Sequence, residues 1–269
     1  MAFRSLRRTP LPLSVVLLFF ACALFGPLLA PGSPTEIHLD REYRLPSAEH
    51  LLGTCDNGVD ILSSVLYGAR LAALVALLSV GISLTIGTAL GVYAGYRGGA
   101  VDHAVTGLAD LIQAFPAIVL NIAILAAVAR PGVGHLVLAL AANGWVLYAR
   151  IARAQTLTLR EREFVMAAVA LGASRNRVLI KHILPNLTGP LVVQASAGLG
   201  AAILAESTLS FLGLGPGAAV SWGALLDQGS AVLLRYPHVA LIAGSVIATT
   251  VLSFNLTGDW LGERMSPKN

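Results

Sequence analysis

Long apolar runs alternate with shorter polar segments along almost the whole chain. An α-helix crosses the hydrocarbon core of a bilayer with about twenty mostly apolar residues. Runs of this kind lie at 11–30, 71–95, 103–129, 134–150, 187–213 and 239–254. The pattern predicts an all-α, polytopic membrane protein with six transmembrane helices.

The first apolar run follows three arginines, Arg4, Arg7 and Arg8, so the chain begins like a secretory signal peptide. No clear small-x-small cleavage site follows the run, and five further runs lie beyond it. We therefore expect a retained transmembrane helix, which Pro27 and Pro31 bend or end.

The second half of the chain has one long polar interruption, REREFVMAAVALGASRNRVLIKHILPNLTGP at 160–190. The first part predicts a short helix from Glu161 to Leu171. Glu161 and Glu163 stand in its opening turn, where carboxylates favour the positive end of a helix. Gly172 follows as a C-cap.

A second short helix is predicted after that glycine. Ser174 is placed to cap its start, and Pro185 is expected to end it, because proline clashes with the preceding turn. A segment of this kind is too polar to cross a bilayer and too regular to be a plain linker. We expect it to be a docking surface.

Composition agrees with a membrane protein. Of the 269 residues, 56% are hydrophobic and 12% charged, against about 25% charged in soluble domains. The sequence pI is near 9.4, but the basic residues lie between apolar runs and not in one soluble patch, which argues against nucleic acid as a partner. With the amino terminus inside, most of them fall on the cytoplasmic side, together with 160–190 and both termini.

Catalytic and metal-binding signals are missing from the sequence. The chain has two cysteines, Cys22 and Cys55, and no His/Cys/Glu cluster with metal-ligand spacing. It has no phosphate-binding loop of the Gly-x4-Gly-Lys-Ser/Thr type and no nucleophile elbow. We expect no catalysis and no cofactor bound by this chain. A stand-alone ion-coupled carrier and an intramembrane hydrolase remain as alternative classes.

Two carboxylates lie inside predicted spans, where an ionised side chain costs about 2.5–3.5 kcal/mol at mid-bilayer. Asp110 is expected near the cytoplasmic interface and Glu206 near the outer mouth. Each either faces the translocation path or forms a helix-joining hydrogen bond. The same two roles are open to the neutral polar residues within spans, where the helix-joining role is favoured for each alone. They are Gln113, Asn121, Asn143 and Gln194.

The polar segment also carries a family resemblance. Ala167-Ala168, Gly172 and Leu184-Pro185 have the spacing of the EAA loop of bacterial ABC importer permeases, and HILPN at 182–186 is similar to the C-type permeases of dipeptide, oligopeptide and nickel importers. The glutamate that gives the loop its name falls on Met166, so Glu161 or Glu163 must supply any acidic contact.

Further matches extend the resemblance over most of the chain. They are HLLGTCDNGVDILSSVLYGAR from residue 50, AESTLSFLGLG from 205, SWG at 221–223 and FNLTGDWLGERMSP from 254. Two departures are Cys55, where an acid is usual, and Val59, where a basic residue is usual.

The resemblance implies a type I ABC importer permease fold in a bacterial inner membrane. Residues 1–70 form the first helix and an outer loop, and 71–269 form the permease domain, with the coupling loop at about 154–190. The resemblance also implies a role: half of the translocation pathway of a peptide importer, or of a nickel or haem importer of the same architecture.

The resemblance names partners and contact residues as well. The partners are a homologous B-type permease, two ATPase subunits that hold ATP and magnesium, and an extracytoplasmic solute-binding protein. The residues implied in ATPase coupling are Glu161, Glu163, Ala167, Ala168, Gly172, Ala173, Ser174, Leu184 and Pro185. Asp110, Gln113 and Glu206 are the candidates for the translocation path.

Overall fold

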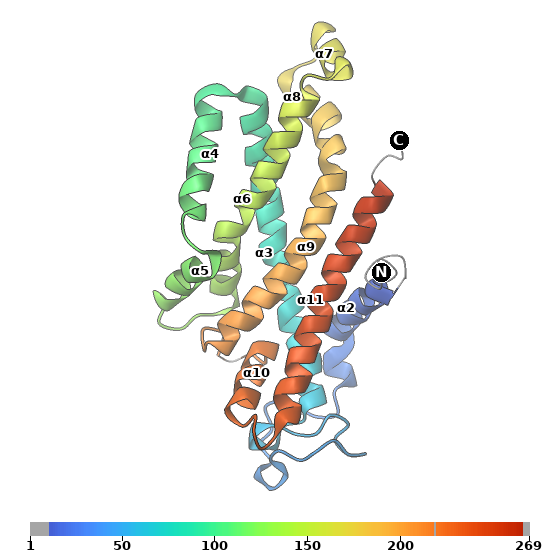
Figure 1. Cartoon of the computed structure of the whole chain (residues 1–269), viewed down its shortest axis with the longest axis vertical. Coiled ribbons are helices and arrows are strands. Elements are labelled where there is room, and N and C mark those ends of the chain that lie inside the picture. The colour runs from blue at the N-terminus through green and yellow to red at the C-terminus, as the bar shows by residue number, and fades with distance from the viewer. Residues whose placement is uncertain (1–10, 218, 266–269) are drawn as a thin grey trace.

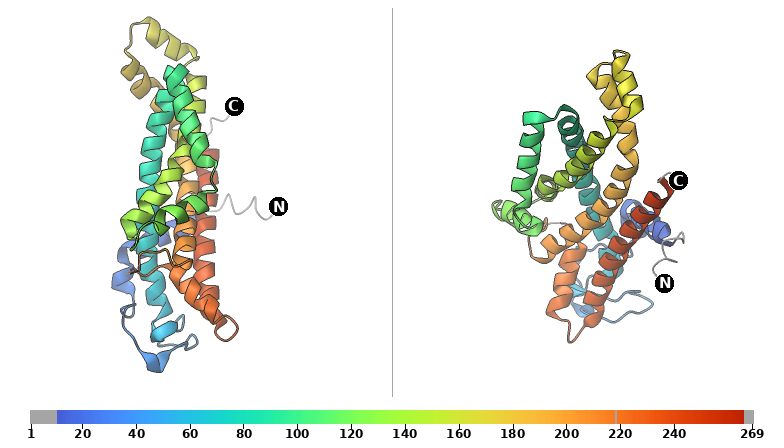
Figure 2. Two further views of the ribbon diagram at one scale, coloured as in Figure 1. Left: turned by 90° about the vertical axis from the view of Figure 1, so that its left-hand side faces the viewer. Right: turned by 45° about the horizontal axis from the view of Figure 1, so that its top comes forward.

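The computed structural model describes residues 11–217 and 219–265. They form an elongated helical bundle (Figures 1 and 2). The arginines at positions 4, 7 and 8 lie outside the described residues. Two 3-10 turns, Leu39–Arg41 and Asp56–Gly58, lie in the loop after the first helix. The helices are α2 Leu11–Leu29, α3 Ile61–Arg97, α4 Gly99–Gln113, α5 Ala117–Ala126, α6 Val133–Leu159, α7 Glu163–Ala170, α8 Arg175–Val178, α9 Leu184–Phe211, α10 Trp222–Ala231 and α11 Pro237–Met265.

The fold class is as predicted. Among the described residues, the only strand-like pairing is an isolated bridge between Thr54 and Asp60. Five helices (α2, α3, α6, α9 with the turns before it, and α11) are long and apolar enough to cross a membrane, and α4 with α5 makes a sixth if the bent pair counts as one span.

Helix α3 is the axis of the bundle, and its glycines bring α6 close. Its 37 residues extend about 55 Å at 1.5 Å per residue, well beyond the apolar thickness of a bilayer. A Cβ atom on Gly87 would collide with the carbonyl oxygen of Trp145, and one on Gly91 with that of Ala149. The sequence places these two glycines on one helix face, and the structure confirms that they admit a neighbouring helix.

The predicted span 103–129 is not one continuous helix. It breaks at Phe115-Pro116, where α4 and α5 meet at 80°. Pro116 has ψ near 129°, an extended value, and it cannot donate the backbone hydrogen bond that a continuous helix needs. Figure 1 shows α5 folded across the foot of α4.

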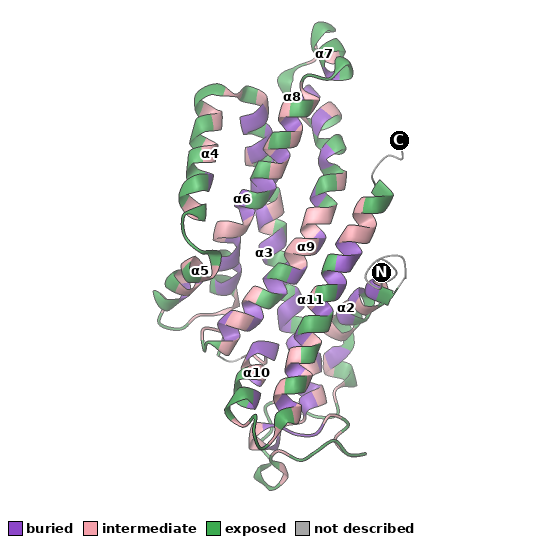
Figure 3. Ribbon diagram, viewed as in Figure 1, coloured by how far each residue is buried: buried purple, intermediate pink, exposed green. Residues whose placement is uncertain are grey.

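The first helix packs into the bundle, as expected of a retained transmembrane helix. Phe19 of α2 is buried, with its ring centroid 5.6 Å from Phe254 of α11 and 5.8 Å from Trp222 of α10. The buried residues line the inner faces of α3, α6 and α9 (Figure 3).

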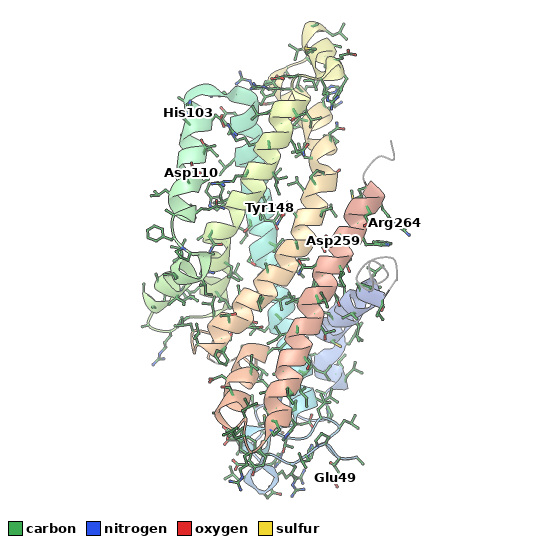
Figure 4. All side chains as sticks on the ribbon, viewed as in Figure 1. Glu49, His103, Asp110, Tyr148, Asp259 and Arg264 are labelled. Atoms are coloured by element: carbon green, nitrogen blue, oxygen red, sulfur yellow. The ribbon has the colours of Figure 1, made fainter. Side chains whose placement is uncertain are left out.

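The two ends of the bundle differ. Helices α7 and α8 project beyond the other helices at one end, and the loop at 30–60 gathers with α10 at the other (Figure 1). We call these the hairpin end and the α10 end. Glu49 lies at the α10 end, far from α7 (Figure 4).

Candidate functional site

The hairpin of residues 160–183 contains both predicted short helices, but its first helix is shorter than expected. Helix α7 begins at Glu163 and ends at Ala170, so Glu161 lies before it, exposed and 3.7 Å from the Arg160 guanidinium. The side chain of Val165 is buried in the main core of the bundle. That contact fixes one face of α7 and leaves the opposite face free.

Gly172 ends the first helix as predicted. It has φ +83°, and its amide donates to Val169 O at 2.9 Å while the amide of Ala173 donates to Ala168 O at 3.0 Å. This pair of bonds is the Schellman motif, which needs a left-handed residue at the position of the glycine. Ala173 packs on the core beyond it.

The second helix does not end at Pro185, and this prediction is wrong. Helix α8 passes through a π-helical turn, Leu179–Ile183, directly into α9, in which Pro185 occupies the first turn. A proline near a helix start loses no hydrogen bond, and the wider π turn accommodates the missing donor. Ser174 stands at the N-cap of α8, but its side chain makes no capping hydrogen bond.

The free face of the hairpin is apolar with basic residues around it. Phe164 is 44% exposed, Met166 52%, Val169 50% and Leu171 89%. Ala167 is exposed and Ala168 half-buried on the same helix. Four exposed basic residues flank this face: Arg162, Arg175, Arg177 and Lys181. Several large apolar side chains left exposed on one short hairpin, next to charged ones, are typical of a protein interaction site.

Both stems of the hairpin are attached to the bundle. On the α6 side, the Arg160 guanidinium donates to Gly95 O at 3.0 Å. On the α8 side, the Arg175 guanidinium lies 5.9 Å from the centre of the Tyr96 ring. Because Gly95 and Tyr96 both belong to the end of α3, a force on the hairpin reaches the central helix as well as α6 and α9.

A cavity of about 570 Å³ lies in the middle of the bundle, with walls from α3, α4, α5, α6, α9 and α11. Gln113, Asn121, Asn143 and Gln194 all line it; for these four residues the sequence left a path role open but favoured helix joining. The helix-joining role also occurs, because Asn143 Nδ2 donates to Asn121 Oδ1 at 2.7 Å and links α6 to α5.

Sequence reasoning missed four polar residues of the lining: Tyr148, Asn255, Ser79 and Ser83. Tyr148 is 3% exposed, and its ring belongs to the main hydrophobic core. In the sequence it is a single aromatic residue in an apolar run. The signal that could have found it is its position on α6 shortly after Asn143.

A second hollow of about 1310 Å³ lies nearer the hairpin end. Its walls include Ile151 of α6, Pro185 and Gln194 of α9, and Met265 of α11. Gln194 also lines the central cavity. This side chain therefore lies between the two hollows.

Asp110 is not among the residues that line the central cavity. Its Oδ1 accepts from the Arg150 guanidinium at 2.7 Å, with the two side chains 70% and 48% exposed. On the same helix, Asp102 forms a two-pronged ion pair with Arg153, whose second nitrogen lies 2.6 Å from Oδ2. These pairs attach α4 to α6 (Figure 4 labels Asp110), and a path role for Asp110 stays a prediction.

Glu206 is fully buried and also lies away from the cavity lining. Its carboxylate accepts from the hydroxyl of Ser210 at 2.8 Å and from that of Ser207 at 3.3 Å, both on its own helix. It lies near the α10 end, because a Cβ on Gly223 of α10 would collide with Ser207 O. These serine bonds stay within α9 and do not join two helices.

The loop at the α10 end holds its polar groups through contacts within the loop and to the start of α3. Asp60 caps α3 by accepting from Ser63 N at 2.8 Å and lies 2.9 Å from His50 Nδ1. Cys55 is 2% exposed, and burial, with the nearby Asp56 carboxylate, raises the pKa of its thiol to about 12. The segment 50–60 thus positions the start of α3.

These features together define a class of protein. The described residues form a multi-pass helical bundle with a polar central cavity and a helical hairpin that projects from one end, which is the architecture of a transport permease. A solved chain of the MetNI methionine ABC transporter, in an inward-facing conformation, shares this fold, with a TM-score of 0.61 at 17% identity over 76% of this chain and 96% of the other. A second, from an amino acid ABC transporter, gives a TM-score of 0.58 over 75% and 94%.

The family follows from the sequence comparisons. The protein-family model described as "Binding-protein-dependent transport system inner membrane component" matches residues 87–269. A dipeptide transport system permease protein of Alkalihalophilus pseudofirmus is 38% identical, with 99% of this chain and 89% of the relative covered. An oligopeptide transport system permease protein of Bacillus subtilis is 33% identical, covering 99% and 87%. The chain belongs to the family of binding-protein-dependent transport system inner membrane components.

Proposed function

We propose that this chain is a permease subunit of an ATP-driven importer of dipeptides or oligopeptides, and that it forms half of the translocation pathway. The observation that carries the proposal is the hairpin 160–183, which combines an exposed apolar face with stems on the two helices, α6 and α9, that line the central cavity. The names of the relatives, which are dipeptide and oligopeptide permeases, supply the substrate class.

The hairpin is the ATPase-coupling loop in this proposal. The face formed by Phe164, Met166, Val169 and Leu171 enters a groove of an ATPase subunit, while Glu161 and Glu163 supply acidic contacts at its edge. ATP and magnesium are held by the two ATPases. This chain binds no cofactor of its own and performs no hydrolysis.

The hairpin end faces the cytoplasm, and so do both termini, in the inner membrane of a bacterium. The α10 end faces outward and receives an extracytoplasmic solute-binding protein. A second, homologous B-type permease completes the pathway across the central cavity. Nucleic acid has no place in the assembly.

Coupling follows from the way the hairpin is attached. ATP binding closes the ATPase dimer and displaces the two coupling loops, and each loop moves the α6 and α9 to which it is joined. A ligand shifts such an equilibrium only by its differential affinity for the two states. The Schellman turn at Gly172 and the continuous α8–α9 helix keep the hairpin stiff enough to transmit the displacement.

An ion-coupled carrier is the weaker alternative. That class needs titratable groups on the substrate path, and both candidates, Asp110 and Glu206, lie off the cavity lining. Such a carrier also transports without any ATPase, so uptake by the purified chain alone in proteoliposomes distinguishes the two classes.

The variant Ala168→Asp tests the coupling loop. Ala168 is half-buried in α7, and a carboxylate there meets the ATPase without a partner, a cost of about 3–5 kcal/mol. We expect the variant to insert normally, while copurification of the ATPases and ATP-dependent uptake fall about 100-fold or more. Ala48→Asp, at an exposed site of the α10 end, is the control. Normal uptake by Ala168→Asp disproves the coupling role.

A further inference from the structure

The central cavity has a neutral polar lining and a buried hydroxyl without a partner. The described residues that line it include no Asp, Glu, Lys, Arg, His or Cys. Its polar groups are amides and hydroxyls: Gln113, Asn121, Asn143, Gln194, Asn255, Tyr148, Ser79 and Ser83. Its volume of about 570 Å³ lies within the range of about 300–1,000 Å³ that is usual for ligand pockets.

Tyr148 is the unusual member of this lining. Its hydroxyl is buried and makes no hydrogen bond to any described residue. Buried polar groups nearly always have a partner, so an unpartnered hydroxyl requires an explanation. The ring is fixed by the core, and the hydroxyl reaches Gly198 of α9, where a Cβ atom would collide with it. The tyrosine therefore holds its one polar atom in place at the wall of the cavity (Figure 4).

Glycine makes room for a second hydroxyl at the same cavity. A Cβ on Gly144 would lie 2.5 Å from Ser83 Oγ, and both residues line the cavity. Two glycines thus leave space next to two hydroxyl groups. Two of the amide groups in the lining already have partners, since Asn255 Nδ2 donates to Val251 O and Asn143 Nδ2 to Asn121. The Tyr148 hydroxyl is the buried group that is left for a ligand.

We propose that Tyr148 hydrogen-bonds a backbone amide group of the peptide in transit, and that the cavity binds peptides through their amide groups and not through their charges. The proposal rests on the proposed function as a peptide permease.

A peptide group is neutral and offers one donor and one acceptor, which amide and hydroxyl side chains satisfy in either direction. The same chemistry serves peptides of different side chains and charges. A transport site must also release its cargo, and neutral bonds are weak enough to allow this. A transition-metal ion prefers imidazole, thiolate or carboxylate ligands, none of which lines the cavity. The lining therefore favours peptide over nickel as the cargo at this site.

The test uses the complete importer, reconstituted in proteoliposomes with its ATPases, partner permease and binding protein. The probes are labelled L-alanyl-L-alanine and its depsipeptide, in which an ester replaces the amide and weakens hydrogen bonding at that group. Tyr148→Phe removes only the hydroxyl. Tyr67→Phe, on α3 and outside the cavity lining, is the matched control, and Gln194→Leu tests the opposite wall.

We expect Tyr148→Phe to lower the uptake of the dipeptide about 5-fold, the effect of one neutral hydrogen bond, and to lose the wild-type preference for amide over ester by the same factor. The wild-type and Tyr148→Phe importers use the same binding protein, so any selectivity of the binding protein between the two probes affects both equally and cancels from the comparison. Gln194→Leu should lower dipeptide uptake in the same way, and Tyr67→Phe should match wild type.

Three results would overturn the proposal. If Tyr148→Phe transports both probes like wild type, the hydroxyl has no role, and the peptide importer stands without it. If uptake falls but the amide-to-ester ratio is unchanged, the hydroxyl is structural, for example as a contact to the partner permease. If the wild-type complex imports no peptide at all, the proposed function fails and this inference fails with it.

Discussion

The hairpin end and the α10 end are held together in different ways. At the α10 end, contacts join residues far apart in the sequence: Trp222 Nε1 donates to Val65 O at 2.9 Å, and the rings of Tyr43 and Tyr236 stack at 4.6 Å. The hairpin is held mainly by bonds between near neighbours, and it joins the bundle through its two stems and a few anchors. The α10 end is thus a platform held by contacts between distant residues. The hairpin end is a lever, a segment that moves as a unit, whose exposed apolar side chains are left for a partner.

The difference gives the two ends different mechanical roles: the hairpin transmits movement, and the α10 end stays fixed. A lever has to move as a unit, which the Schellman turn and the continuous α8–α9 helix provide. A platform has to keep the start of α3 in place, which the Asp60 cap and the buried loop around Cys55 provide. Each prediction below changes one end and leaves the other intact.

Of the changes at Gly172 and Cys55, the larger effect on uptake is expected at Gly172. No atom lies within 4 Å of a Cβ built there, so the cost of a side chain comes from φ +83° alone, about 1–3 kcal/mol. We expect Gly172→Val to reduce ATP-dependent uptake about 10-fold or more, as a strained turn misplaces α7.

Asparagine tolerates the left-handed region better than valine, so Gly172→Asn should retain most of the uptake. Gly134→Val is the control, because that glycine also faces open space but has no positive φ. Equal uptake by the valine and asparagine variants of Gly172 would mean that the turn does not depend on its backbone conformation, and that the hairpin is less stiff than we infer.

A smaller effect, on reactivity alone, is expected at the α10 end. The thiolate is the reactive form of cysteine, and the pKa of Cys55 is raised to about 12. The thiol therefore stays protonated through neutral pH, and its maleimide labelling should rise about tenfold per pH unit between pH 7 and 9.

At pH 8 the labelling of Cys55 should be on the order of 1,000-fold slower than that of a cysteine with an ordinary pKa. Ser47→Cys, at an exposed site of the same loop, provides this comparison in a background without Cys55. Fast labelling of Cys55 at pH 7 would show that the loop opens readily and is not a rigid platform.

Much of this arrangement could be predicted from the sequence, because the relevant signals are local. The apolar runs gave the spans, and Gly172 was correctly placed as the cap, since a helix end of this kind depends on one residue type. The four-residue spacing of Gly87 and Gly91 is also a local signal, because it places both glycines on one helix face, where another helix can approach closely.

The failures have physical causes of their own. Pro185 was expected to end a helix. In the structure it lies in the first turn of the following helix, where a proline loses no backbone hydrogen bond. The sequence alone could not show whether Pro185 ends one helix or begins the next, because that depends on the register of the π turn before it. The bend at Pro116 divides a predicted span whose residues are mostly apolar, so hydropathy could not reveal it. Tyr148 reaches the cavity because of where α9 packs, and this depends on residues distant in the sequence.

The central claim is that the hairpin lies in the cytoplasm and is held by an ATPase subunit. Leu171 is 89% exposed at its tip, so Leu171→Cys, with Cys22 and Cys55 replaced by serine, is the site for a crosslinker in the working complex. We predict a crosslink to the ATPase whose yield changes on ATP binding, and protection from an impermeant reagent added outside intact cells. Labelling from outside, or a tip that crosslinks to no other chain, would contradict the account.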